Sequence, residues 1–526
     1  MGLFQDFAGA RRISTVQPDA RAAAACARPV AEDVRTFLPD VDARLLDVVA
    51  RARNPLDPLE LRDLWLGRVE HELGTRSRRP ELAEQWRRSR LWREVTAEEV
   101  LSSRSTVRFV KELFNWFFRD DLYGDLAEQR ALLLSSGSVD EEHWGLPETL
   151  KECLRFALRR DWYGYSDSRG RIPAREAVAA YENALMERPV YDERNVAITL
   201  GGTFTVSTLA DFVLSGTTAA AGQALCGIPN YPPLVEAVAR RRDVRLVPLP
   251  STAGRTSLQP LIAALTPETP LVLLQTAANP TGALVDEAEL AQLINTASPT
   301  TTIVLDECHE WLGPERLRSV ARAARNVVRV SSLSKNWSAP GMKTGWMLAD
   351  RGFIDEYYEH ASTMFGGPPS FLYTVVEVLA RMERWRITGL SDAGIAELAE
   401  FEPSYGLTAD RLNRAFHAYL TERDTREDAL STLRAATCHR LGQLAEVTVP
   451  AYSINAAITF PEWDDSYLCF RDLLRETGVA VYPGILNFCF NGGVARVTTA
   501  RPWDELSAAA DRLHVALGSM AGTADA

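Results

Sequence analysis

The chain has 526 residues, of which 46% are hydrophobic and 24% are charged, and its formal net charge is −12. This balance is typical of a globular protein with more than one packed unit, and it excludes collagen-like fibres and disordered chains. The acidic surplus argues against a broad binding surface for nucleic acid or anionic lipid, and no apolar run approaches the roughly 18 to 20 residues of a membrane span, so we expect a cytoplasmic protein.

The first region, residues 1–140, has the apolar spacing of helices, as in the stretch 106–114. Up to residue 142 it carries 22 basic and 25 acidic side chains. It therefore lacks the basic stripe of a DNA-binding helical domain, and we expect a helical N-terminal extension.

The second region, residues 141–375, alternates short β-branched or apolar runs with helical stretches. Alternation of this kind predicts an α/β fold with a mainly parallel sheet between helices. The third region, residues 376–526, returns to helices and then alternates strands and helices, which indicates a smaller α+β domain. The clearest predicted strands cover residues 196–200, 271–274, 303–305 and 327–330.

Two turn motifs follow predicted strands. In the stretch 199–203, Gly201 and Gly202 join a strand to a helical run, where backbone N–H groups at the helix N-terminus could bind a phosphate. Asn279 begins Asn-Pro-Thr-Gly after the strand that ends near Gln275, and its amide could hydrogen-bond a ligand. Taken singly, each motif is equally compatible with an ordinary turn.

A carboxylate and a lysine follow the next two strands. Asp306 ends the strand 303–305, where it could keep a pyridine nitrogen protonated or simply cap a helix. Lys335 leaves the strand 327–330 through a Ser-rich turn, a position from which an amine can form a Schiff base. The chain contains only four lysines against 54 arginines, so each lysine position is informative.

The order Gly-Gly-Thr, Asn-Pro-Thr-Gly, Asp-Glu and Ser-x-Ser-Lys resembles the class I/II aminotransferases, which are pyridoxal-phosphate enzymes of fold type I. The resemblance covers about residues 135 to 515. It implies a large domain at 141–375 with a mainly parallel, seven-stranded type of sheet between helices, and a smaller α+β domain at 376–526. The N-terminal helical region lies outside it.

The resemblance also implies a role for individual residues. Lys335 corresponds to the lysine that binds pyridoxal 5′-phosphate, Asp306 to the partner of its ring nitrogen and Asn279 to the donor to its ring hydroxyl. Tyr231 corresponds to the aromatic residue that stacks on the ring, and Arg496 to the arginine that binds the substrate α-carboxylate. The residues that resemble the phosphate site are Gly202, Thr203, Ser332 and Ser334.

Tyr165 resembles the tyrosine that reaches the phosphate of the neighbouring subunit. The expected assembly is therefore a homodimer with shared active sites.

Two positions depart from the family pattern. His309 stands where the family usually has tyrosine, and it either substitutes for that tyrosine or acts as a pH-dependent donor. Lys343 stands where the family usually has arginine, and it is either a point charge for the phosphate or a second proton-transferring amine. We favour the plain substitution at both positions.

The resemblance implies an aminotransferase that acts on an α-amino acid through an external aldimine and a quinonoid. The alternative is a lyase or synthase that performs β- or γ-elimination, replacement or cyclisation, for example on S-adenosylmethionine. A transcription regulator with an aminotransferase-like domain is disfavoured, because the N-terminal region is not basic. The seven cysteines form no Cys-x-x-Cys pair and the histidines no His-Glu-x-x-His spacing, so we expect no metal site.

Overall fold

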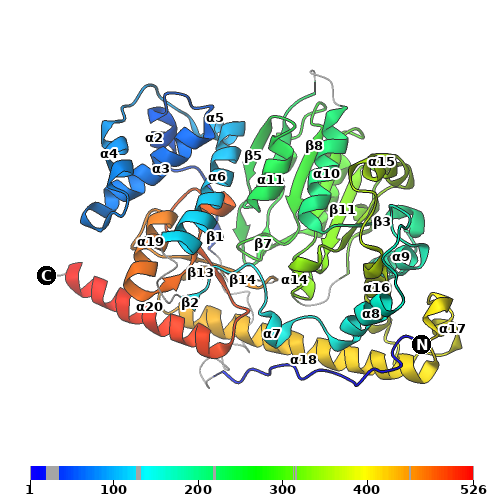
Figure 1. The fold of residues 1–526 in the computed structure, drawn as a ribbon. Coiled ribbons are helices and arrows are strands. Elements are labelled where there is room, and N and C mark those ends of the chain that lie inside the picture. Colours follow the sequence, from blue (N-terminus) through cyan, green and yellow to red (C-terminus); the bar gives the residue numbers. More distant parts are fainter. Residues whose placement is uncertain are drawn as a thin grey trace.

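The computed structural model describes residues 2–18, 35–125, 132–216, 221–311, 313, 317–448, 450 and 452–524. Figure 1 shows a large sheet covered by helices, a smaller sheet beside it, and a group of N-terminal helices next to both. Within the described ranges, none of the helices combines the length and the apolar character that a membrane crossing requires.

The large sheet has seven strands in the described part of the chain, in the order β3-β12-β11-β10-β8-β4-β5. β12 runs antiparallel to both of its neighbours, and the other strands are parallel to one another. This confirms the α/β fold expected from the sequence. The strands are β3 (Val196–Thr199), β4 (Ala224–Ile228), β5 (Val244–Pro248), β8 (Leu271–Gln275), β10 (Thr302–Asp306), β11 (Val327–Ser332) and β12 (Gly345–Leu348).

Both faces of this sheet are buried, which explains why its strands are continuous apolar runs. Successive side chains of a strand point to opposite faces. Leu271 and Leu273 of β8 accordingly pack into one core, while Val272 and Leu274 pack into another. The first core includes α10 (Gly202–Ser215), α11 (Pro232–Ala239) and α15 (Arg351–Met364); the opposite face is covered by α9 (Ile172–Met186), α12 (Gln259–Ala264), α13 (Glu287–Thr296) and α16 (Tyr373–Thr388).

The C-terminal part forms an antiparallel sheet in the order β13-β14-β17-β16, with long helices packed against it. Its strands are β13 (Glu446–Thr448), β14 (Asn455–Thr459), β16 (Tyr482–Pro483) and β17 (Val494–Thr498), and its helices are α18 (Ala409–Leu441), α19 (Ser466–Thr477) and α20 (Trp503–Ala524). We retain 1–140, 141–375 and 376–526 as a proposed domain division.

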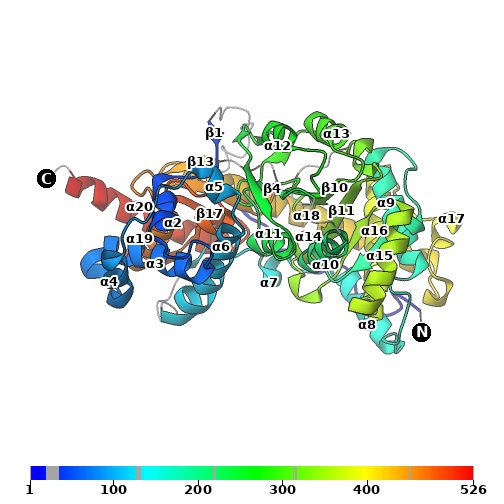
Figure 2. The same cartoon turned by 90° about the horizontal axis from the view of Figure 1, so that it is seen from above.

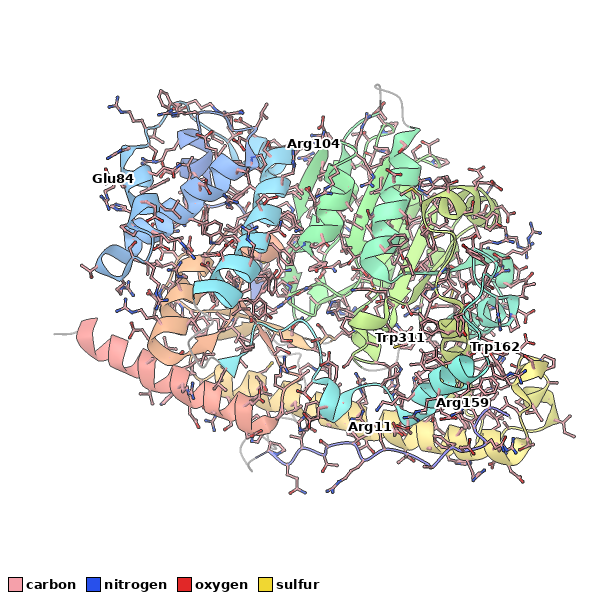
Figure 3. The ribbon with its side chains drawn as sticks, in the orientation of Figure 1. Arg11, Glu84, Arg104, Arg159, Trp162 and Trp311 are labelled. Atoms are coloured by element: carbon pink, nitrogen blue, oxygen red, sulfur yellow. The ribbon has the colours of Figure 1, made fainter. Side chains whose placement is uncertain are left out.

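The N-terminal region is helical, as predicted. It contains α2 (Ala43–Arg51), α3 (Pro58–Leu73), α4 (Pro80–Arg88), α5 (Ala97–Leu101), α6 (Arg104–Trp116) and the helical turn η3 (Phe117–Asp125) that continues α6. In Figure 2, α6 lies between α3 and α11, so it joins this region to the large sheet. Arg104, labelled in Figure 3, donates a hydrogen bond from Nη2 to the backbone oxygen of Arg240 at 3.1 Å.

The remaining elements are short connections. One small sheet pairs β2 (Leu132–Leu133) with β15 (Val479–Ala480). A second has the strand order β1-β6-β7-β9, with β1 (Thr36–Phe37), β6 (Ser251–Thr252), β7 (Arg255–Thr256) and β9 (Leu284–Val285). The other helices and turns are α7 (Glu141–Trp144), α8 (Glu148–Arg159), α14 (Leu333–Asn336), α17 (Ile395–Leu398), η2 (Gly74–Arg76), η4 (Glu193–Asn195), η5 (Val320–Ala323), η6 (Pro340–Met342), η7 (Ser370–Leu372), η8 (Pro403–Tyr405) and η9 (Gly484–Asn487).

Candidate active site

A cavity of about 290 Å³ lies where the parallel strands of the large sheet end. Parallel strands place their carboxyl ends at the same edge, so the loops that follow β3, β4, β8, β10 and β11 meet there. All the site residues predicted from the sequence line this cavity except Tyr165. They are Gly202, Thr203, Tyr231, Asn279, Asp306, His309, Ser332, Ser334, Lys335, Lys343 and Arg496.

The carboxylate of Asp306 is held on both of its oxygens. Oδ2 accepts a hydrogen bond of 2.8 Å from Nε2 of Gln275, its register partner on β8. Oδ1 accepts a bond of 3.2 Å from the backbone N–H of Cys308. These bonds fix the orientation of a buried carboxylate at the edge of the cavity.

Lys335 enters the cavity from α14, directly after β11. Its Nζ donates a hydrogen bond to the backbone oxygen of Gly137. Burial, together with the nearby positive charge of Arg496, lowers the pKa of Lys335 to about 8. The amine is therefore easier to deprotonate than a lysine in water.

One end of the cavity has the donors of an anion site. Gly201 precedes α10 with a φ of +87° and supplies no side-chain cap to the first turn of that helix. A Cβ on Gly202 would lie 2.9 Å from Sγ of Cys308, so a larger residue would crowd this approach. The helix N-terminus, the hydroxyl groups of Thr203, Ser332 and Ser334, and the ammonium of Lys343 together suit a phosphate.

Arg496 lies on β17 and lines the cavity. Its Nη2 donates to the backbone oxygen of Ser135 at 2.8 Å, and its Nη1 donates to Oδ1 of Asn279 at 3.4 Å. The guanidinium lies 3.9 Å from the ring centre of Tyr482. Its Nε, and both amide atoms of the buried Asn455, have no hydrogen-bond partner within the described residues. A buried donor set of this kind suits a carboxylate ligand.

His309 is buried, and its Nδ1 lies 3.1 Å from Oγ of Ser453. Burial lowers the pKa of His309 to about 3, assisted by the charges of Lys335 and Arg496. The imidazole is therefore neutral at physiological pH. This gives no support to the pH-dependent donor considered from the sequence, and it leaves His309 able to donate one hydrogen bond as a neutral ring.

Tyr165 is fully exposed and does not line the cavity of its own chain. Its expected place at a neighbouring subunit stays a prediction.

Several residues that line the cavity were not identified from the sequence. A weak sequence signal exists for two of them, because Gln275 is the polar last residue of the apolar strand β8 and Asn455 the polar first residue of β14. Tyr482 had no motif. Phe114 lies in the predicted helical stretch 106–114 and Phe118 follows it, but nothing in the apolar spacing shows that both residues line the cavity.

A mainly parallel sheet with a lysine, an aspartate and a helix N-terminus around one cavity at its carboxyl edge defines an α/β enzyme of fold type I. The profile of the family described as aminotransferase class I and II matches residues 129–513, so the chain belongs to that family. Members of this family are enzymes that use pyridoxal 5′-phosphate.

Among curated proteins, the chain is 26% identical over 405 residues to a valine–pyruvate aminotransferase of Mycobacterium tuberculosis, covering 75% of this chain and 92% of that protein. It is 22% identical over 411 residues to an aromatic-amino-acid aminotransferase of Thermococcus litoralis, covering 75% and 94%.

Solved structures share the fold. The chain superposes on the aromatic aminotransferase of Pyrococcus horikoshii with a TM-score of 0.60 and 18% identity, covering 74% of this chain and 96% of that one. For the N-succinyldiaminopimelate aminotransferase of Mycobacterium tuberculosis, the TM-score is 0.59 and the identity 21%, covering 74% and 94%.

Proposed function

We propose that the protein is an aminotransferase that removes the amino group of an α-amino acid, with pyridoxal phosphate bound at the carboxyl edge of the large sheet. The observation that carries the proposal is that Lys335, Asp306 and Arg496 line one cavity. They bring together an amine of lowered pKa, a fixed carboxylate and a partly unpartnered guanidinium.

The lining residues fit the cofactor. Lys335 would bind its carbonyl carbon, Asp306 its ring nitrogen and Asn279 its ring hydroxyl, while Tyr231 would lie on its ring face. The N-terminus of α10, with Ser332, Ser334 and Lys343, would bind its phosphate. When bound, pyridoxal phosphate supplies an electron sink for the Cα–H bond of an amino acid.

Arg496 and Asn455 would hold the substrate carboxylate. Nε of Arg496 and the amide nitrogen of Asn455 are buried donors without a partner in the described residues, and a carboxylate supplies the missing acceptor. With the carboxylate there, Lys335 is the amine on the cavity wall that can accept and return the proton at Cα.

The position of Lys343 supports the simpler of its two roles. Its side chain is exposed although it lines the cavity, and this position suits a charged group that contacts a phosphate. A solvated ammonium is suited to neutralising part of a phosphate charge. This favours amino-group transfer over the lyase or synthase alternative.

The test is a half-reaction. The holoenzyme is mixed with single L-amino acids, and conversion of the cofactor to the pyridoxamine form is followed by absorbance, together with its reversal by 2-oxoglutarate. We expect reversible conversion with at least one amino acid. Release of ammonia with the cofactor unchanged would favour elimination instead.

A matched pair of lysine variants tests the attachment site. Lys335→Ala should abolish the cofactor label that borohydride fixes to the wild-type chain, whereas Lys151→Ala, at a lysine on α8 outside the cavity, should keep it. A label that persists in Lys335→Ala would contradict the assignment.

A further inference from the structure

The N-terminal helical region forms part of the cavity wall. The family match begins at residue 129, yet Phe114 on α6 and Phe118 on η3 line the same cavity as Lys335. Their neighbours Leu113 and Phe117 are completely buried, whereas Phe114 and Phe118 are only partly buried. The two rings therefore retain apolar surface that a ligand in the cavity can cover.

The two rings contact residues of the proposed cofactor and carboxylate positions. Phe114 packs edge-on against Tyr231 with ring centres 5.9 Å apart, and Phe118 lies 6.3 Å from Tyr482, the ring beneath Arg496. Phe114 and Phe118 also contact each other at 4.9 Å. Together they form a continuous aromatic surface, which we call the aromatic wall.

The aromatic wall is held in place from two sides. α6 packs on α11 of the large domain, and Phe117 contacts Phe470 of α19 at 4.9 Å. Asp121, at the end of the same segment, accepts a hydrogen bond of 2.6 Å from the hydroxyl of Tyr467 on α19. These contacts are buried, so the wall is a fixed part of the site.

We propose that Phe114 and Phe118 bind the side chain of the amino-acid substrate and select large apolar or aromatic side chains. This inference rests on the proposed function and names the substrate class of the same site. In the proposed function, Arg496 binds the carboxylate of the amino acid and its amine lies near Lys335. The side chain is then the part of the substrate that contacts the cavity wall. Burying an apolar side chain against the rings is favourable, while a charged side chain would lose hydration against them.

The experiment compares Phe114→Ala and Phe118→Ala with the wild-type holoenzyme on L-phenylalanine, L-leucine, L-alanine and L-aspartate. We expect kcat/KM for L-phenylalanine to fall about tenfold or more in each variant, because a ring contact is lost, while L-alanine changes by less than about threefold. Trp92→Ala is the matched control, since Trp92 lies in the same region, is 57% exposed and does not line the cavity.

A binding measurement separates this inference from the proposed function. The ligand is 3-phenylpropanoate, which has the carboxylate and the ring but no amine. Its dissociation constant, measured by calorimetry, should be at least about tenfold larger for Phe118→Ala than for the wild type. If the alanine variants fold poorly, Phe114→Leu and Phe118→Leu replace them, because leucine keeps the apolar packing of the helix. We expect the leucine variants to show the same change in selectivity.

Equal losses for L-phenylalanine and L-alanine, or a wild-type preference for L-aspartate, would overturn the aromatic wall as a selectivity device. If no amino acid converts the wild-type cofactor, the proposed function fails, and weaker 3-phenylpropanoate binding in the variants would still support the wall.

Discussion

At the scale of single residues, Lys335 shows how the fold changes an amine. Burial and the nearby charge of Arg496 lower its pKa to about 8 from the ordinary lysine value near 10.5. Because the neutral amine is the nucleophile, the rate at which apoenzyme binds pyridoxal phosphate covalently should rise with pH and level off above about pH 8. The measurement is the reconstitution rate, followed by cofactor absorbance, at a series of pH values.

Arg496→Gln supplies the control for that profile. Removing a positive neighbour favours the protonated amine, so the apparent pKa of Lys335 should move upward in this variant. A wild-type rate that keeps climbing toward pH 10.5, or a downward shift in Arg496→Gln, would contradict the electrostatic account.

At the scale of elements, α3 and η3 are attached to α19 by buried charges. Glu70 of α3 accepts a bond of 2.8 Å from Nη1 of Arg471, and the same Nη1 lies 3.8 Å from Oδ1 of Asp121 on η3. Arg68 of α3 also pairs with Asp465. The N-terminal region is therefore bound to the C-terminal part of the chain through charges that are largely removed from water.

Breaking this attachment should destabilise the protein. Arg471→Ala leaves the buried carboxylate of Glu70 with fewer partners, and we expect the free energy of unfolding to fall by about 3 kcal/mol. This value is near the lower end of the cost of breaking a buried ion pair, because Ser77 still donates a hydrogen bond to Glu70. Thermal denaturation followed by circular dichroism measures the effect.

The matched control is Arg88→Ala. Arg88 is exposed over 78% of its side chain and pairs with Glu84, which Figure 3 labels on the outer surface. An exposed pair of this kind contributes about 0.5 kcal/mol or less. Equal destabilisation by both variants would show that the α3–α19 charges do not anchor the region.

At the scale of the whole molecule, the shared-site homodimer is a prediction that rests on Tyr165. Its ring is fully exposed, and it lies outside the cavity of its own chain. If it donates its hydroxyl to the phosphate bound by a second copy, Tyr165→Phe should weaken pyridoxal phosphate binding about tenfold while the dimer mass is unchanged. Equilibrium binding and sedimentation measure the two quantities.

Tyr163→Phe is the control, because Tyr163 is also exposed and donates to Asp161 within its own chain. A fully active monomer that retains its cofactor would refute the shared site.

The sequence alone was enough to predict the α/β sheet and most of the residues that line the cavity. Strands that are buried on both faces consist of consecutive apolar residues. The strands β3, β8, β10 and β11 could therefore be predicted from the local pattern of apolar residues in the sequence. Asp306 and Lys335 directly follow two of these strands, and parallel strands bring their carboxyl ends to one edge. Local sequence and one topological rule therefore determined where these residues meet.

Only the tertiary structure decided which distant segments complete the site. Gln275 could be recognised as the partner of Asp306 only once β8 and β10 were in register, and Asn455 as a cavity residue only once the C-terminal sheet faced the large one. Phe114 and Phe118 have the same helical spacing as core residues, and what distinguishes them is the contact of α6 with α11 and of η3 with α19. Such contacts join residues more than a hundred positions apart, and they depend on packing and desolvation, which no short motif encodes.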